Sequence, residues 1–287
     1  MISAGIVLYN PDTEFLKQSL KALLPQVDNV CLIDNASENK SEIYQVINSF
    51  NLDSIKLIVN NENAGIAYAL NQILTYSNLI QADWLLTLDQ DSLVQDLLIK
   101  KYKFFLSSHS DERIGLVNCY PLIGTPRNEQ LLIEKENDVM LPTSGSFINV
   151  PLVFGKVSFD SKMFIDCVDY DFNLSIRSYG YKIYLAPFYG FHHQVGTVSP
   201  TLSFMGKKLI TFQKYSSSRI YYQARNSVYM MRKWRNSYFV RHFLERMLMY
   251  FIFHPSCIKS YGKSAINGLV DSTKISINYS NQNKPQN

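Results

Sequence analysis

The stretch Trp84-Leu85-Leu86-Thr87-Leu88-Asp89-Gln90-Asp91-Ser92 decides how the fold is interpreted. An apolar run of strand length ends here in two carboxylates that are one residue apart. Two carboxylates at a strand end can hold a hard divalent cation, such as Mg²⁺ or Mn²⁺, against a diphosphate. Because isolated Asp-x-Asp pairs are common by chance, the meaning of this pair depends on what precedes it in the chain.

Three more apolar runs of strand length precede this stretch, and segments with helical spacing separate them. The runs are Ile2–Leu8, residues 30–33 and Ile55–Val59. After the first run, we expect Asn10 to cap a helix whose first residue is Pro11. A further helix is expected to start near Ala64. This alternation of strands and helices predicts an α/β fold with a mostly parallel sheet flanked by helices.

A polar cluster follows each of the four predicted strands. The clusters are Tyr9-Asn10, Asp34-Asn35, residues 60–63 and residues 89–92. Ligands of parallel sheets bind beyond the carboxyl ends of the strands, so the clusters are expected to converge at one edge. Each cluster alone is equally compatible with ordinary loops and helix caps, but four in succession favour a binding site. Near the third cluster, Gly65 allows close backbone approach, and Asn63 and Asn71 supply amide donors and acceptors near a helix N-terminus. Taken alone, this segment is better explained as an ordinary loop at a helix start.

Three groups of residues in the second half of the chain carry side chains that could act in catalysis or bind a metal or phosphate. In residues 166–171, Asp-Cys-Val-Asp-Tyr-Asp, one carboxylate could serve as a general base, although such residues more often cap a helix. The pair His192-His193 follows a predicted strand and is a candidate for metal or phosphate contact. Arg219, Tyr222 and Arg225 could clamp a diphosphate, or could form the solvated face of a basic helix.

The remaining segments have simpler patterns. We expect a charged loop over residues 134–138, a tight turn over residues 143–146, and strands over residues 147–150 and 182–185. Beyond Pro200 the sequence turns to helical patterns rich in aromatic and basic residues. We expect these to form a C-terminal helical segment over residues 201–275, followed by a disordered polar tail over residues 276–287.

The composition limits the class of protein. The 287 residues are 46% hydrophobic, which is enough for a sizeable core. A net charge of +4 does not indicate a nucleic-acid partner, and we expect none. The cysteines form no Cys-x-x-Cys pair, so we expect a reducing compartment and place the protein in the cytoplasm. The sequence has neither a signal-peptide pattern nor an apolar run of about 18 residues.

In their order and spacing, these motifs resemble the family 2 glycosyltransferases with a GT-A fold. The likeness is greatest to the bacterial rhamnosyltransferases that use dTDP-L-rhamnose. The residues that carry it are Val7-Leu8-Tyr9-Asn10, Leu32-Ile33-Asp34-Asn35-Ala36-Ser37, Asn63-x-Gly65 to Asn71, Leu88-Asp89-Gln90-Asp91, Ser144-Gly145-Ser146, Phe164-Ile165-Asp166-x-Val168-Asp169, His193-x-x-Gly196 and Arg219-x-Tyr221-Tyr222-x-x-Arg225-Asn226. Two positions depart from the common family pattern: Val168 stands where Glu is frequent, and Gln72 where Gly is frequent.

The resemblance implies an inverting transfer that depends on Mg²⁺ or Mn²⁺, with Asp169 as the catalytic base. It implies a metal site at Asp91 and His193, and a diphosphate site at Arg219, Tyr222 and Arg225 on a C-terminal segment that closes over the donor. The other implied roles are nucleotide binding by Tyr9, Asn10, Asp34, Asn63, Gly65, Asn71 and Asp89, and contact with the donor or acceptor sugar by Ser144, Gly145 and Asp166.

The resemblance further implies a catalytic domain over residues 1–200, dTDP-L-rhamnose as donor, and a glycan on a lipid carrier as acceptor in O-antigen or capsule synthesis. The apolar and basic stretch 238–254 could lie on the cytoplasmic face of the inner membrane, or could pack within the protein. Three alternatives stay open: a family 2 enzyme with another donor such as a UDP-hexose, a non-catalytic sugar-nucleotide-binding protein, and a haloacid-dehalogenase-type phosphatase. The phosphatase requires Asp89 as nucleophile, although that motif normally closes the first strand of its fold.

Overall fold

The computed structural model describes residues 1–110, 112–122, 132–193, 201–204, 207–211 and 214–277. They divide into two compact units. The sheet unit contains residues 1–161 and 169–193, and the helical unit contains residues 162–168 together with the described residues from 201 onward. The predicted domain boundary at residue 200, the motif residue Gly196 and nearly all of the predicted tail lie outside the described residues.

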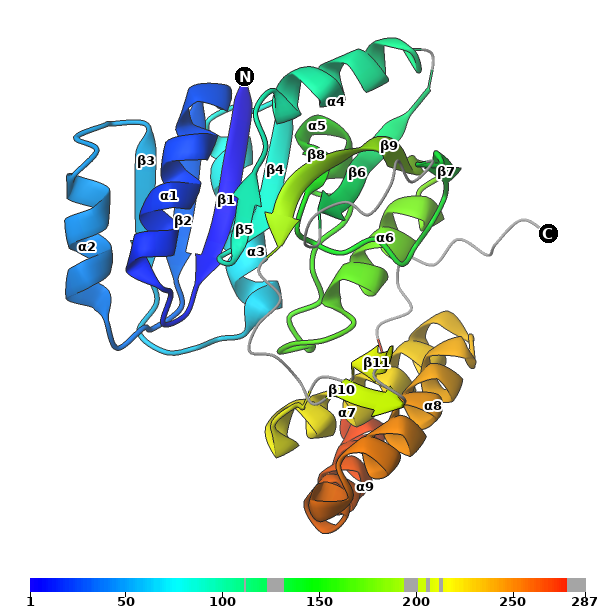
Figure 1. Ribbon diagram of the computed structural model, residues 1–287. Coiled ribbons are helices and arrows are strands. Elements are labelled where there is room, and N and C mark those ends of the chain that lie inside the picture. The colour runs from blue at the N-terminus through cyan, green and yellow to red at the C-terminus, as the bar shows by residue number, and fades with distance from the viewer. Residues whose placement is uncertain (111, 123–131, 194–200, 205–206, 212–213, 278–287) are drawn as a thin grey trace. The chain divides into compact units, whose positions relative to one another are not determined.

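The sheet unit is built on a mixed sheet (Figure 1). Its strands are β1 (Ile2–Leu8), β2 (Asn29–Asp34), β3 (Ile55–Val59), β4 (Trp84–Asp89), β5 (Ser92–Val94), β6 (Ile114–Leu122), β7 (Lys135–Glu136), β8 (Ser146–Asn149) and β9 (Lys182–His193). They pair in the order β3-β2-β1-β4-β8-β6-β9-β5, and β7 pairs with β9. The first four positions in this order are parallel, as predicted, whereas β8 runs antiparallel to both β4 and β6.

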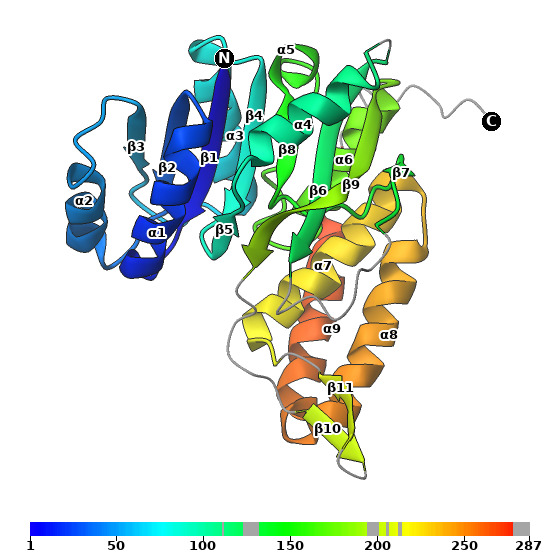
Figure 2. The ribbon, with the colours of Figure 1, turned by 45° about the horizontal axis from the view of Figure 1, so that its top comes forward.

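Helices cover both faces of this sheet. They are α1 (Thr13–Leu23), the 3₁₀ turn η1 (Leu24–Gln26), α2 (Lys40–Asn48), α3 (Ile66–Leu79), α4 (Leu98–Ser107), α5 (Val150–Val153) and α6 (Val168–Ser178). Figure 2 shows α1 and α4 in front of the sheet and α3, α5 and α6 behind it. The helices α1, α2 and α4 share one apolar core with the sheet, to which Leu20, Val46 and Tyr102 contribute.

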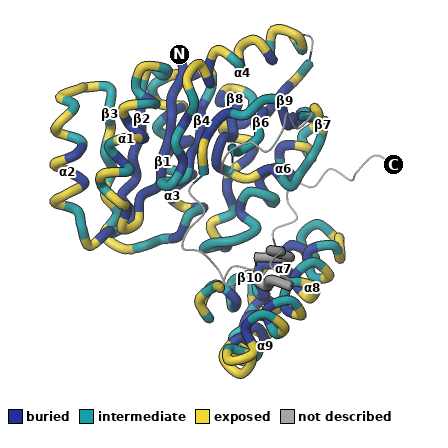
Figure 3. The backbone as a smooth tube through the Cα atoms, viewed as in Figure 1, coloured by how far each residue is buried: buried dark blue, intermediate teal, exposed yellow. Residues whose placement is uncertain are grey.

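Burial explains why the first strands could be predicted from sequence. Every residue of β1 is buried, and β1 lies between β2 and β4, so both of its faces and both of its edges are covered (Figure 3). A strand covered on both faces consists of an uninterrupted apolar run, which is how residues 2–8 appear in the sequence. The predicted strands over residues 30–33 and 84–88 each extend by one residue at one or both ends.

Several local predictions were wrong. The side chain that caps α1 is Asp12, which accepts from the amides of Glu14 and Phe15, whereas Asn10 lies in the left-handed region at φ 48°. Residues 135–136 of the predicted charged loop form the short strand β7. The strand predicted over residues 182–185 continues to His193, because β6 pairs with it as far as His192 and β5 pairs with residues 191–193.

The helical unit consists mainly of α7 (Ser217–Trp234), α8 (Tyr238–Phe253) and α9 (Ile258–Lys274), with the turn η2 (Pro255–Cys257) and the hairpin of β10 (Thr201–Phe204) and β11 (Lys207–Thr211). Helix α7 packs on α8 and α9 around Ile220, Phe243 and Tyr261. The approach of α9 to α7 is close at Gly268, where a Cβ atom would lie 2.3 Å from the carbonyl oxygen of Tyr221. No helix among the described residues is long and apolar enough to cross a membrane.

Candidate active site

The polar clusters that follow the parallel strands are joined by hydrogen bonds, as the sequence predicted. Gln90, beyond β4, pairs its side-chain amide with the backbone of Tyr9 beyond β1, at 2.8 and 3.2 Å. The amide of Asn10 donates to the hydroxyl of Ser37 beyond β2, at 2.9 Å. The strand ends of β1, β2 and β4 therefore form one edge, on which the Tyr9 side chain is 48% exposed and accessible to a ligand.

Asn35 is the centre of the network at this edge, and it was not among the predicted site residues. Its buried side chain donates to the Asn63 carboxamide oxygen at 2.8 Å. Its own oxygen accepts from Asn60 at 3.0 Å and from the Ala64 amide at 3.2 Å. Asn35 thereby fixes the loop in which Gly65, at φ 86°, precedes the first turn of α3. This loop presents backbone amides at a helix N-terminus, an arrangement suited to anions.

Two predicted nucleotide contacts are engaged in local structure. The Asp34 carboxylate is buried and accepts from the Ser37 amide at 2.9 Å, which closes a tight turn after β2. The Asn71 side chain exchanges two hydrogen bonds with the backbone of Phe159, at 2.8 and 2.9 Å. For both residues, contact with a nucleotide stays a prediction.

Asp89 and Asp91 of the Asp-x-Asp pair come together with His193, which was identified in a separate motif. One potential ligand atom from each lies within 4.8 Å of the other two. The nearest measured pair is Nδ1 of His193 and Oδ1 of Asp91, which are 3.5 Å apart. Two carboxylates and an imidazole, all partly exposed, form a donor set that a divalent cation of the Mg²⁺ or Mn²⁺ type accepts.

The turn over residues 143–146 is fixed beside this group from three sides. The Thr87 hydroxyl donates to the Thr143 carbonyl at 2.7 Å, and the buried Asn118 amide donates to the Pro142 carbonyl at 2.7 Å. The Tyr102 hydroxyl donates to the carbonyl of Gly145. Burial raises the pKa of Tyr102 well above its usual value, which keeps this donor protonated.

Asp169 lies in the first turn of α6, where its carboxylate accepts from the Tyr170 amide at 3.0 Å. Together with Thr87, Thr143 and Asn173 it lines a narrow recess of the sheet unit. The recess brings Asp169 to the same turn that borders the carboxylate and imidazole group. Its role as catalytic base stays a prediction.

The remaining predicted residues belong to the helical unit. Arg219 binds the Asp166 carboxylate through Nε and Nη2, at 3.2 to 3.3 Å. Burial, the largest single cause, lowers the pKa of Arg219, but the charge and hydrogen bonds of Asp166, with smaller contributions from Tyr215 and Tyr250, together raise it. Arg225 donates to the Lys162 carbonyl at 2.6 Å and lies over the ring of Tyr222. These contacts hold residues 162–166 against α7, and the diphosphate and sugar roles of these residues stay predictions.

Comparison with known proteins shows a likeness to glycosyltransferases. Residues 3–111 match the model of glycosyl transferase family 2. The dTDP-rhamnosyl transferase RfbF of Shigella flexneri is 26% identical over 248 residues, which cover 81% of this chain and 80% of that protein.

Solved structures with little sequence in common share the fold. The structure of S. aureus TarS residues 1–349 is 13% identical with a TM-score of 0.58, over 94% of this chain and 80% of that one. The mannosyltransferase PcManGT from Pyrobaculum calidifontis, in complex with GDP-Man and Mn²⁺, is 13% identical with a TM-score of 0.57, over 96% and 75%.

These matches decide among the alternatives that the sequence left open. A phosphatase of the haloacid dehalogenase type is excluded, because the Asp-x-Asp pair ends β4 inside a matched glycosyltransferase domain. The strand order, the helical C-terminal segment and the matched structures agree on a GT-A architecture. The chain is therefore a glycosyltransferase with a GT-A fold, similar over residues 3–111 to glycosyl transferase family 2 and over most of its length to a dTDP-rhamnosyl transferase.

Proposed function

We propose that this enzyme transfers L-rhamnose from dTDP-L-rhamnose to a hydroxyl group of a glycan acceptor, with inversion at the anomeric carbon. The observation that carries the proposal is the meeting of Asp89, Asp91 and His193 at the edge where the parallel strands end. The likeness to the dTDP-rhamnosyl transferase RfbF supports rhamnose as the sugar. A UDP-hexose is the alternative donor, because donor choice depends on pocket shape.

The proposed reaction is a single displacement. Asp169 takes the proton from the acceptor hydroxyl, and that oxygen forms a bond to the anomeric carbon on the face opposite the diphosphate. The bond between the anomeric carbon and the diphosphate oxygen breaks, and the nucleoside diphosphate leaves. Tyr9, Asp34 and the Asn63-Gly65 loop hold the nucleoside, while Asp89, Asp91 and His193 hold the cation that offsets charge on the departing diphosphate. Such electrostatic stabilisation is usually the largest contribution to the rate.

The metal site fits a six-coordinate cation. An ion about 2.1 Å from each ligand atom accommodates ligand atoms up to about 4.2 Å apart. The three ligand atoms lie within 4.8 Å of one another, so only small side-chain movements are needed to close on an ion. When bound, Mg²⁺ or Mn²⁺ supplies positive charge for the leaving diphosphate.

A lipid-linked acceptor is supported by the outer face of α8. One face of this helix buries Phe239, Phe243 and Met247. The opposite face exposes Leu244, Leu248 and Ile252 at 56%, 61% and 59%. These three are four residues apart, and therefore form one apolar stripe along the helix. With exposed Arg241 and Lys259 near its ends, the stripe suits the interface of an anionic membrane.

The central test measures nucleoside diphosphate released from a panel of dTDP-L-rhamnose, UDP-glucose, UDP-galactose and GDP-mannose, with and without Mn²⁺. We expect Mn²⁺-dependent release from dTDP-L-rhamnose, and loss of release in Asp91→Ala. Asp53→Ala, an exposed aspartate in the loop before β3, is the matched control and should retain activity. Release from a different donor would keep the enzyme class and discard rhamnose. Release that persists without metal and in Asp91→Ala would contradict the proposed site.

Membrane binding is tested separately by flotation with vesicles of phosphatidylcholine, with or without phosphatidylglycerol. The wild type should float only with the anionic vesicles, and less at high salt. A triple change of Leu244, Leu248 and Ile252 to glutamine should abolish flotation. Matched changes on α9, Ile266→Gln and Val270→Gln, remove exposed apolar side chains elsewhere and indicate whether the α8 stripe is specific.

A further inference from the structure

Two buried hydroxyl groups form a bridge directly beneath the candidate metal site. Ser92 opens β5 and Ser144 lies in the turn before β8, and both side chains are at most 3% exposed. Their Oγ atoms are 2.8 Å apart. The two serines are separated by 52 residues in the chain, so the bridge depends entirely on the tertiary fold.

Each end of this bridge contacts a residue of the candidate metal site. The backbone amide of Asp89 donates to Oγ of Ser144 at 3.2 Å. Oγ of Ser92 lies 3.4 Å from Nδ1 of His193, and Ser92 and His193 stand opposite each other in the antiparallel pairing of β5 with β9. One chain of polar contacts therefore runs from Asp89 through the two serines to His193.

Strand pairing connects these two ligands directly only through the short strand β5, whose Ser92 pairs with His193. Asp89 ends β4 and His193 ends β9, and β8 and β6 lie between those strands in the pairing order. Hydrogen bonds of the sheet control the separation of neighbouring strands, whereas across two intervening strands any change in twist accumulates. A direct bridge between the two strand ends removes that freedom.

We propose that Ser92 and Ser144 are positioning residues, whose hydroxyl bridge sets the placement of Asp89 and the ring orientation of His193. In this arrangement Ser92 holds Nδ1 of His193, and Nε2 is left for the divalent cation. The inference rests on the proposed metal-dependent function. Side chains that hydrogen-bond to metal ligands commonly alter metal affinity without touching the ion, because they orient the ligands before binding. Neither serine contacts the reacting sugar in this assignment, so the sugar contact implied for Ser144 is replaced by a supporting one.

The sheet unit contains a second buried serine pair that serves as a matched control. Oγ of Ser77 in α3 donates to Oγ of Ser3 in β1 at 3.1 Å, and both side chains are fully buried. This pair has the same chemistry and burial as the bridge, but it joins a helix to the base of a strand. Ser77→Ala therefore shows how Mn²⁺ affinity and thermal stability respond when a buried serine pair that contacts no metal ligand is broken.

The experiment is a titration of Mn²⁺ alone, followed by electron paramagnetic resonance of the free ion, in wild type, Ser92→Ala, Ser144→Ala and the double variant. We expect each single change to weaken Mn²⁺ binding about 10- to 100-fold. Because both changes break one bridge, the double variant should bind no more weakly than the weaker single variant. Ser77→Ala should bind Mn²⁺ as the wild type does. Thermal melting of all variants verifies that they are folded. If one of the two single serine variants does not fold, the other is sufficient to test the bridge.

Pulsed paramagnetic resonance of bound Mn²⁺ gives a signature that altered stability would not produce. Coupling to imidazole nitrogen should be present in the wild type and Ser77→Ala, and weaker in Ser92→Ala. Equal Mn²⁺ affinity and equal coupling in Ser92→Ala and Ser77→Ala would overturn the bridge while leaving the metal site intact. Absence of Mn²⁺ binding by the wild type would overturn the metal site of the proposed function, and the bridge with it.

Discussion

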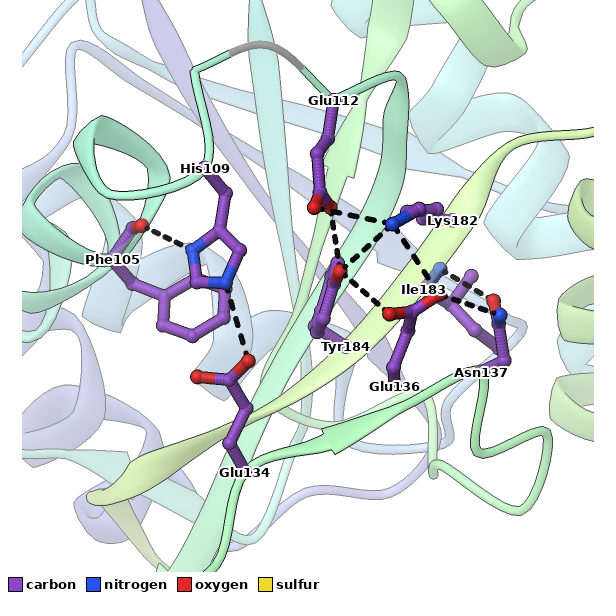
Figure 4. Close-up of polar contacts among 9 residues, drawn as sticks. All are labelled: Phe105, His109, Glu112, Glu134, Glu136, Asn137, Lys182, Ile183 and Tyr184. Atoms are coloured by element: carbon purple, nitrogen blue, oxygen red, sulfur yellow. Dashed lines mark hydrogen bonds and ion pairs between the residues drawn. The ribbon is translucent and has the colours of Figure 1, made fainter.

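His109 lies against Phe105 with the ring centroids 4.4 Å apart, at the C-terminal end of α4 (Figure 4). Its Nδ1 donates to the carbonyl of Phe105 at 3.0 Å, and its Nε2 contacts the Glu134 carboxylate at 3.2 Å. The imidazole thereby links α4 to the residues that precede β7. This link lies away from the candidate metal residues, which makes it a feature of stability.

The pH dependence of stability should contain a contribution from His109. The hydrogen bond to the Phe105 carbonyl is the main cause that raises the pKa of His109, with additions from Glu134 and Glu112, although burial opposes the increase. A raised pKa in the folded state stabilises the protein fully below the unfolded pKa of about 6.5. This stabilisation is lost as the pH rises through the folded pKa. The test measures the urea concentration at the midpoint of unfolding between pH 5 and 9. Above pH 6.5 this concentration should fall less steeply with pH in His109→Gln than in the wild type.

Glu134→Gln separates the two partners of the histidine. Because the Phe105 carbonyl is the largest single cause of the raised pKa of His109, Glu134→Gln should reduce the pH dependence but not abolish it. A slope in Glu134→Gln that equals the slope in His109→Gln would show that the carboxylate dominates. That result would reverse the assigned order of the two causes.

Gly145 and Gly155 provide a paired test of the turn beside the active site. Both have positive φ, at 79° and 76°, so alanine at either position is strained by about 1–2 kcal/mol. At Gly145 an added Cβ would lie 2.4 Å from the ring of Phe191, whereas at Gly155 it meets nothing within 4 Å. Gly145→Ala should therefore lower the free energy of unfolding by a further 1–3 kcal/mol or so. Denaturant titration of both variants measures the difference, and equal losses would contradict the steric argument.

The sequence predicted the parallel half of the sheet well, and β1, β2 and β4 form apolar runs there because they are largely buried. In β1 and β3 the ends of the predicted strands coincide with the structure. Helix starts were less certain, because several residues near Pro11 can act as a cap. Asp12 took that role, since its carboxylate reaches two amides of the first turn.

The supporting residues of the site could not be predicted, because their partners are distant in the chain. Asn118 reaches the turn at Ser144 from β6, and Ser92 meets Ser144 across 52 residues. Each is an ordinary polar residue in an apolar strand, a pattern without a unique interpretation. Asn35 had a weak signal, since it directly follows Asp34 at a strand end, but only the fold shows that it joins Asn60, Asn63 and Ala64.

Asn35 should matter for both stability and nucleotide binding. Asn35→Ala leaves the partly buried Ala64 amide and the Asn63 carboxamide without this partner, which should cost about 1–3 kcal/mol of stability. The Gly65 loop loses its support, so we also expect the affinity for dTDP to fall about tenfold, equivalent to about 1.4 kcal/mol. Calorimetric titration with dTDP measures the affinity. Asn173→Ala, which removes a buried amide bound to the carbonyls of Val139 and Leu141, should lose stability but keep its dTDP affinity.

Asp169→Asn tests the proposed base, because the amide keeps the size of the carboxylate and its contact with the Tyr170 amide but cannot accept a proton. We expect kcat for transfer to fall about 10²- to 10⁴-fold. The affinity for dTDP and for Mn²⁺ should not change, since neither ligand is bound by Asp169 in the proposed mechanism. Rates with acceptor present and calorimetric titration with dTDP separate the two effects. Full activity in Asp169→Asn would assign the proton to a different group, and a loss confined to donor affinity would make Asp169 a binding residue instead.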